Sequence, residues 1–192
     1  MKFGLALCAT ILSLSVLTPV SAGAMGRPVQ IGFGGGISVP VSDAKDALKN
    51  GFHGQAMVKW KVPTMPLGLR GTVGYERMTL KSLAPGLDGT GSILSGVGNV
   101  TLGKSVGPIR PYILAGLGVF NTKTDVTGTA SASQTKFGID GGVGAEFKLG
   151  PITGFLEGKL VNIFTDQGFS SAVTSANNFS TQIIPVTFGI FF

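Results

Sequence analysis

His53 is the only histidine of the chain, so it is the first residue to test for acid–base chemistry. A hydrolase would place such a histidine beside a nucleophile and an orienting acid. Gly54 and Gln55 follow it, and no His-x-Ser sequence occurs in the chain. We therefore interpret His53 as a structural histidine and expect no enzymatic activity and no catalytic residue.

Metal and cofactor sites are not indicated either. Cys8 is the only cysteine, and one histidine without clustered carboxylates does not supply the ligands of a zinc or calcium site. The run Gly32-Phe-Gly-Gly-Gly36 is followed by no Gly-Lys-Ser/Thr sequence and by no predicted helix, so a phosphate loop is not expected. Glycines on the inner face of a curved strand explain it better.

The remaining charged residues recur at every second position, between apolar neighbours. Such a period of two indicates strands with one apolar and one polar face. Since charges of both signs occur in similar number, we predict a polar network that neutralises itself inside a small barrel. A narrow water or ion path lined by the same side chains is the alternative. The predicted members are His53, Lys59, Arg70, Glu76, Asp140, Glu146, Lys148, Glu157 and Lys159.

Eight segments carry the alternation, near residues 29–39, 52–62, 67–78, 92–102, 110–121, 137–149 and 152–164, with a last strand ending on 184–192. Long and short connections alternate strictly between them, and 121–136 is expected to be a loop. Ser42 is a candidate cap for a short helix through 47–49. The segment at 110–121 is apolar on both faces, and we expect Tyr112, Leu114 and Phe120 to point outward.

The composition indicates that the outer face meets lipid. Charged residues make up 12% of the chain, whereas about 25% is usual for a soluble domain. Residues 1–24 have a basic start, an apolar core and an Ala-x-Ala end, which predicts a cleaved signal peptide and a mature domain over 25–192. Beyond it no apolar run is long enough for a membrane helix, so a closed sheet in a membrane remains. The net charge of +6 is scattered, without a basic run for nucleic acid.

Aromatic residues of the apolar faces gather near the strand ends, where membrane–water interfaces select them. We predict two girdles, one on each side of the membrane. Their members are Trp60, Tyr75, Tyr112, Phe137, Phe147 and Phe164.

Together these features resemble the eight-stranded outer-membrane β-barrel family, which includes OmpA-like proteins. The resemblance covers the whole mature chain. The features that carry it are the signal peptide, Arg110-Pro-Tyr-Ile-Leu-Ala-Gly-Leu-Gly118, Gly141-Gly-Val-Gly-Ala-Glu-Phe147 with Leu149-Gly150, Glu157-Gly-Lys159, and the closing Ile184-Pro-Val-Thr-Phe-Gly-Ile-Phe-Phe192. The resemblance implies an all-β, antiparallel, up-and-down transmembrane barrel in the outer membrane of a Gram-negative cell. It also implies that the barrel-assembly machinery reads the alternate apolar residues of the terminus, which are Ile184, Val186, Phe188, Ile190 and Phe192.

The resemblance further implies outer-membrane lipids and periplasmic chaperones as partners, and a monomer. The family contains anchors, adhesins and structural proteins, so we expect a non-enzymatic structural or surface-interaction role. A narrow pore for small solutes or ions and a lipid-modifying enzyme are the alternatives. A soluble lipocalin-like barrel is disfavoured, because its charged outer surface and terminal helix are not found in the sequence.

Overall fold

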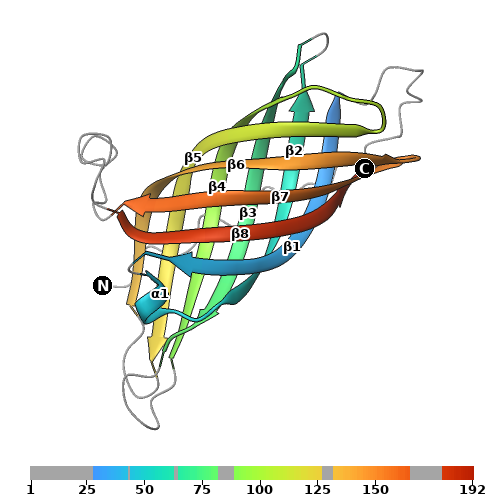
Figure 1. The fold of residues 1–192 in the computed structure, drawn as a ribbon. Helices are drawn as coiled ribbons and strands as arrows, with labels where there is room; N and C mark the ends of the chain where they lie inside the picture. The colour runs from blue at the N-terminus through green and yellow to red at the C-terminus, as the bar shows by residue number, and fades with distance from the viewer. Residues whose placement is uncertain (1–27, 43, 63–64, 82–88, 127–131, 165–178) are drawn as a thin grey trace, which may run out of the picture.

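The structure is a computed structural model, which describes residues 28–42, 44–62, 65–81, 89–126, 132–164 and 179–192. The predicted signal peptide and Cys8 lie outside these residues. The described strands are β1 (Val29–Val41), β2 (Gly51–Lys61), β3 (Leu67–Thr79), β4 (Gly89–Gly103), β5 (Ile109–Val126), β6 (Ala132–Leu149), β7 (Ile152–Phe164) and β8 (Phe179–Phe191). Each pairs antiparallel with its neighbours in the chain, and β1 pairs with β8 to close the barrel (Figure 1).

Close backbone approach makes the closure possible. Along the β1–β8 seam Gly34 pairs with Gly189, and Gly36 pairs with Thr187. A Cβ atom at Gly36 would collide with the backbone of Val186, so only glycine fits there. The amide of Phe192 donates to the carbonyl of Ile31 at 2.9 Å, which extends the ladder to the last residue of the chain. The seam therefore leaves no unpaired strand edge along this stretch.

The alternation of side chains divides the sheet into an apolar outside and a mixed inside. Large apolar residues face outward along the strands, for example Phe33, Val73 and Val143, which are 55–63% exposed. Most of the charged residues between them point into the lumen and are buried, for example Lys59, Arg70 and Glu157. No helix among the described residues is long and apolar enough to span a membrane.

The predicted strict alternation of long and short connections is wrong at one position: residues 127–131 join β5 to β6, and this connection is no longer than residues 104–108 between β4 and β5. Short turns join β2 to β3, β4 to β5 and β6 to β7, and positive φ angles at Gly107 and Gly150 (62° and 67°) allow two of them to turn tightly. The chain enters β1 and leaves β8 at this same end, called here the short-turn mouth (Figure 1). At the opposite, long-loop end lies α1 (Ala44–Ala47), four residues long.

The helix differs from the prediction. It begins at Ala44 and ends at Ala47, the first residue of the expected 47–49 segment. Ser42 has a positive φ of 50°, and its hydroxyl donates to the side chain of Gln182 on β8. The residues after the helix instead join the barrel, because the Lys49 amide donates to the carbonyl of Thr79 and Leu48 bridges to Leu80.

The predicted facing of β5 is wrong. Tyr112, Leu114 and Phe120 point into the lumen and are 4%, 4% and 2% exposed. Ile113 and Leu117 point outward instead. Because β5 is apolar on both faces, the period of two does not fix its phase. The lumen accepts the Tyr112 ring because its partner on β6 is Gly144, which has no side chain to displace it.

The predicted loop at 121–136 is mostly strand. β5 and β6 remain paired to Thr124 and Ala132, well beyond the expected ends. Polar side chains tie this extension together: Asn121 Nδ2 donates to Thr135 Oγ1 at 2.9 Å, and Ser133 Oγ donates to Asn121 Oδ1 at 3.1 Å. Cross-strand polar pairs of this kind stabilise a ladder without apolar residues, so hydrophobic alternation could not reveal it.

Candidate functional site

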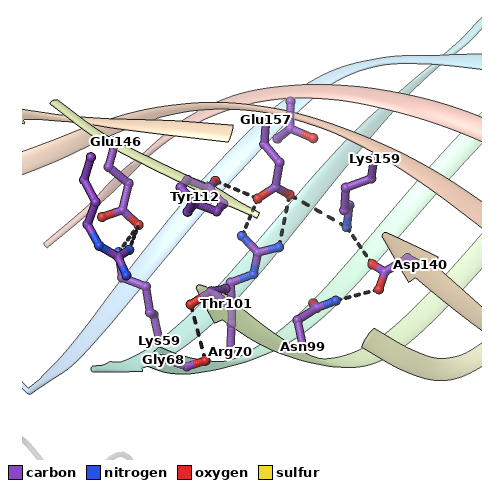
Figure 2. Close-up of polar contacts among 12 residues, drawn as sticks. Lys59, Gly68, Arg70, Asn99, Thr101, Tyr112, Asp140, Glu146, Glu157 and Lys159 are labelled. Carbon is purple, nitrogen blue, oxygen red and sulfur yellow. Dashed lines mark hydrogen bonds and ion pairs between the residues drawn. The ribbon is translucent and has the colours of Figure 1, made fainter. Parts of the chain in front are cut away.

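The lumen is the candidate site, since most chemically reactive side chains of the described residues converge there. From the short-turn mouth to the long-loop end it holds three carboxylate-centred clusters, a histidine cluster and an apolar layer. Figure 2 shows the carboxylate-centred clusters and the strands from which they come.

Glu157 on β7 is the centre of the first cluster. Arg70 on β3 reaches across the lumen and donates to both of its oxygens, at 2.6 and 3.0 Å. The hydroxyl of Tyr112 donates to Oε2 at 2.7 Å, and Lys159 Nζ lies 4.0 Å from Oε1. The Glu157 side chain is completely buried. A buried carboxylate needs several such partners, and here a paired guanidinium and a phenol supply them.

Asp140 on β6 forms the second cluster. Its Oδ2 lies 3.4 Å from Lys159 Nζ, and Asn99 Nδ2 donates to Oδ1 at 2.6 Å. Because Lys159 approaches both Asp140 and Glu157, it joins the two clusters into one network across β3, β4, β5, β6 and β7 (Figure 2).

Glu146 forms the third cluster, nearest the short-turn mouth. Lys59 Nζ lies 2.6 Å from Oε1 and is the closest cation, with Arg110 at 3.5 Å and Lys61 at 3.9 Å. The Lys59 ammonium also lies 3.9 Å from the ring centre of Phe191, a cation–π contact. Phe191 in turn packs on Phe155 with ring centres 5.0 Å apart.

His53 belongs to a separate chain of hydrogen bonds nearer the long-loop end. Ser38 Oγ lies 2.9 Å from His53 Nδ1 and donates to Glu76 Oε2 at 3.0 Å, while Thr187 Oγ1 lies 2.8 Å from His53 Nε2. Since the Ser38 proton goes to Glu76, Ser38 accepts from His53. The bonding therefore fits a neutral ring with its proton on Nδ1.

This arrangement differs from a hydrolytic triad. In a triad the acid orients the histidine, which then takes a proton from the nucleophile. Here Glu76 accepts from Ser38, and the ring donates to Ser38 rather than removing its proton. Both ring nitrogens are engaged with buried partners, so the cluster is suited to holding β1, β2, β3 and β8 together.

An apolar layer fills the lumen beyond the histidine cluster. It consists of Met78, Ile93, Val97, Phe120, Val161, Ile163 and Ile183. Leu48, from the connection after α1, packs against this layer. Between the layer and the charged clusters lies a cavity of about 20 Å³, lined by His53, Glu76, Asp140 and Lys159 among others. That volume holds about one water molecule.

The structure brings eight of the nine predicted lumen residues into buried positions. The exception is Lys148, which lies exposed at the short-turn mouth. Sequence reasoning missed the parts played by Ser38, Thr187 and Tyr112. A signal for Tyr112 was present, because Arg110 lies two residues before it and a charged side chain favours the inner face.

Four of the six predicted girdle residues are at least partly exposed, and two are buried. Trp60 and Tyr75 face outward and are about half exposed, while Phe137 and Phe147 are partly buried. Tyr112 is wrong as a girdle residue, because its hydroxyl binds Glu157 inside the lumen. The prediction for Phe164 is also wrong, because this residue is only 7% exposed and lies where the β7–β8 register shifts. The outward position was inferred from strict alternation, which such an irregularity breaks.

The terminal strand shows the predicted facing. Ile184, Val186, Phe188 and Phe192 are 37–68% exposed on the outer face, and Ile190 is partly buried there. Their reading by an assembly machinery stays a prediction. Among the described residues there is no group of three or more histidines, cysteines and carboxylates arranged to hold a metal ion.

A closed antiparallel sheet with an apolar outside and a charged inside defines a transmembrane β-barrel. The family model described as "Outer membrane protein beta-barrel domain" matches residues 5–192. The chain therefore belongs to the outer-membrane β-barrel family, and its location is the outer membrane.

Solved structures share the fold. Neisserial surface protein A (NspA) is 16% identical with a TM-score of 0.63, over 86% of this chain and 96% of that chain. Ail, the attachment invasion locus protein of Yersinia pestis, is 16% identical with a TM-score of 0.50, over 85% of this chain and 95% of that chain. A comparison with curated proteins found no significant match.

Proposed function

We propose that the protein is a non-enzymatic, non-conducting barrel of the outer membrane, with a structural or surface-interaction role. The observation that carries this proposal is the filling of the lumen. Ion pairs and hydrogen bonds occupy the half near the short-turn mouth, and the apolar layer closes the other half. The small cavity between them does not amount to a continuous path for solutes.

We further propose that the short-turn mouth faces the periplasm and the long connections face the outside of the cell. The names of NspA and Ail describe a surface protein and an attachment and invasion locus protein, which motivates a surface role. At 16% identity the likeness itself extends to the fold. Cleavage after residue 24, delivery by periplasmic chaperones, insertion by the barrel-assembly machinery and a monomeric state are parts of the same proposal.

Two experiments test the proposal. In planar bilayers the purified barrel should give no reproducible single-channel steps, and regular steps would contradict the non-conducting part. In whole cells, an epitope tag inserted at residues 127–131 should bind antibody without permeabilisation. A matched tag at Gly107, in a short turn, should bind only after permeabilisation. The reverse pattern would overturn the proposed orientation.

A further inference from the structure

The short-turn mouth holds a pocket of about 900 Å³, whose inner wall is the Glu146 cluster with Lys61 and Arg110. Residues from the ends of β2, β3, β5 and β6 and from the β4–β5 turn line it. It is far larger than the lumen cavity of about 20 Å³. The pocket is therefore large enough for a molecule rather than a single water.

The pocket is strongly basic. Its cationic lining residues are Lys61, Lys104, Arg110 and Lys148, and its one carboxylate is Glu146. Glu146 has its closest cation in Lys59, at 2.6 Å, and Lys59 lies deeper and does not line the pocket. Arg110 and Lys61 approach the same carboxylate at 3.5 and 3.9 Å, so one negative charge is shared among Lys59 and the four lining cations, which leaves a net charge of +4.

The N–H groups of these four cations are available to donate hydrogen bonds to a ligand. Lys61 Nζ lies 3.9 Å from Glu146 Oε2, which is too long for a hydrogen bond. Lys104 and Lys148 are exposed to the pocket opening. Arg110 is steadied by a bond from Nη2 to the carbonyl of Pro66 at 3.3 Å. Lysine ammonium groups and a fixed guanidinium are the groups that proteins use to bind phosphate.

The other wall of the pocket is apolar and continues onto the outer face of the barrel. Leu67 and Ile109 line the pocket and are 39% and 41% exposed. Leu67 and Ile109 point to the outer face of the barrel, as Leu69 and Ile113 do on the same strands. This apolar rim of the pocket therefore lies at the border between lipid and water. A ligand that bridges the cations and this rim must have an anionic head and an apolar tail.

We propose that this pocket binds the head group of an anionic phospholipid from the membrane leaflet that surrounds the short-turn mouth. The phosphate lies among Lys61, Lys104, Arg110 and Lys148, and the acyl chains leave over Leu67 and Ile109 towards the lipid-facing surface. Basic pockets at membrane interfaces recognise lipid head groups by this combination of charge and position. The inference rests on the membrane location of the barrel but not on a surface role.

The test measures lipid retained by the folded barrel in non-ionic detergent, by native mass spectrometry. The probes are phosphatidylglycerol, phosphatidylcholine and diacylglycerol with identical acyl chains. Phosphatidylglycerol should be retained most and diacylglycerol least. In Lys104→Gln/Lys148→Gln, phosphatidylglycerol binding should weaken about five-fold for each lysine removed. The heat-dependent gel shift in detergent confirms that each variant is folded.

The matched control is Lys45→Gln/Lys49→Gln, which removes two exposed lysines at the long-loop end. It should retain phosphatidylglycerol like the unchanged barrel. Equal losses in both double variants, or none in either, would overturn the site. Competition by glycerol phosphate at the affinity of the lipid would show a site for free phosphate groups and overturn the lipid assignment. A conducting barrel that retains the lipid would refute the proposed function alone.

Discussion

Arg70 and Glu157 lie 87 positions apart in the chain, and in the barrel they form a two-bonded ion pair across the lumen, with N–O distances of 2.6 and 3.0 Å. Both side chains are almost fully buried. The pair links β3 to β7, which are not neighbours in the sheet. It therefore braces the barrel from within, in a direction that the backbone ladders do not cover.

Replacing Arg70 with Ala should lower the free energy of unfolding by about 3–5 kcal/mol, because Glu157 would remain buried without its main cation. The double variant Arg70→Met/Glu157→Leu should be more stable than the single variant, since it leaves no unpaired charge. Urea unfolding in lipid vesicles, followed by the fluorescence of Trp60, measures both.

The exposed pair Lys123–Asp125, with an N–O distance of 3.2 Å, provides a control for the same experiment. Lys123→Ala should change the free energy of unfolding by less than about 1 kcal/mol, as usual for a surface ion pair. A loss at Arg70 no larger than the loss at Lys123 would contradict the bracing role of the lumen pair.

The apolar layer should act as the seal of the lumen. Phe120→Ala/Ile163→Ala removes two side chains that are 2% and 0% exposed, so water should enter and small, regular conductance steps should appear. Leu117→Ala, on the outer face of β5, should give none. If the double variant fails to fold, as judged by the heat-dependent gel shift, Phe120→Ala alone should still raise the leak of ions from vesicles. Tight vesicles with folded variants would show that another layer closes the barrel.

His53→Ala should destabilise the barrel by about 1–3 kcal/mol, because Ser38 and Thr187 would lose a buried partner. Its effect on chemistry should be nil, and the lipid A profile of cells that produce the variant should match that of cells with the unchanged barrel. A changed profile, with normal amounts of folded barrel, would instead favour a lipid-modifying enzyme.

The two terminal phenylalanines should have separable effects. Phe192 faces outward and is 44% exposed, whereas Phe191 is fully buried between Lys59 and Phe155. Deletion of Phe192 should reduce insertion into the outer membrane and leave export to the periplasm intact. Phe191→Ala should still insert but lose about 3–5 kcal/mol of stability. Cell fractionation and the gel shift distinguish the two, and normal insertion without Phe192 would contradict the assembly role.

A charge on the outer face should reveal contact with lipid. Val73 lies midway along β3 and is 61% exposed, so Val73→Arg should cost about 2–4 kcal/mol in a bilayer. Thr79→Arg, at the outward-facing end of the same strand, should cost less than about 1 kcal/mol, because the side chain can reach water. Equal costs at the two positions would argue against a membrane-embedded β3.

The sequence predicts the strands well where one face alone is apolar. In β2 and β3 the regular alternation of apolar residues with Lys59, Arg70 and Glu76 sets both boundaries and facing. The alternation does not set the facing of β5, because Tyr112 and Ile113 are equally compatible with the inner and the outer face. The hairpin extension beyond Asn121 depends on polar cross-strand bonds, which leave no hydrophobic period.

Which lumen side chains pair with one another is harder to predict from the sequence than which side chains point inward. Alternation predicts that Arg70 and Glu157 both point inward, but their meeting depends on the stagger between β3 and β7 around the whole barrel. The registers of β1 with β2 and with β8 place Gly36 opposite both His53 and Thr187, which brings Ser38 and Thr187 to the two nitrogens of the His53 ring. Nothing local to these residues specifies the register, so a sequence pattern predicts a network and not its pairs.

The layering of the lumen has a consequence for assembly under the proposed orientation. The long-loop end must then cross the bilayer first, and this end carries the apolar layer inside. Glu146 and its cations lie at the trailing end, beside the periplasmic water from which the chain arrives. The charged half of the lumen therefore stays near the periplasmic surface of the membrane. The half that must cross the hydrocarbon core is the one that is filled with apolar side chains.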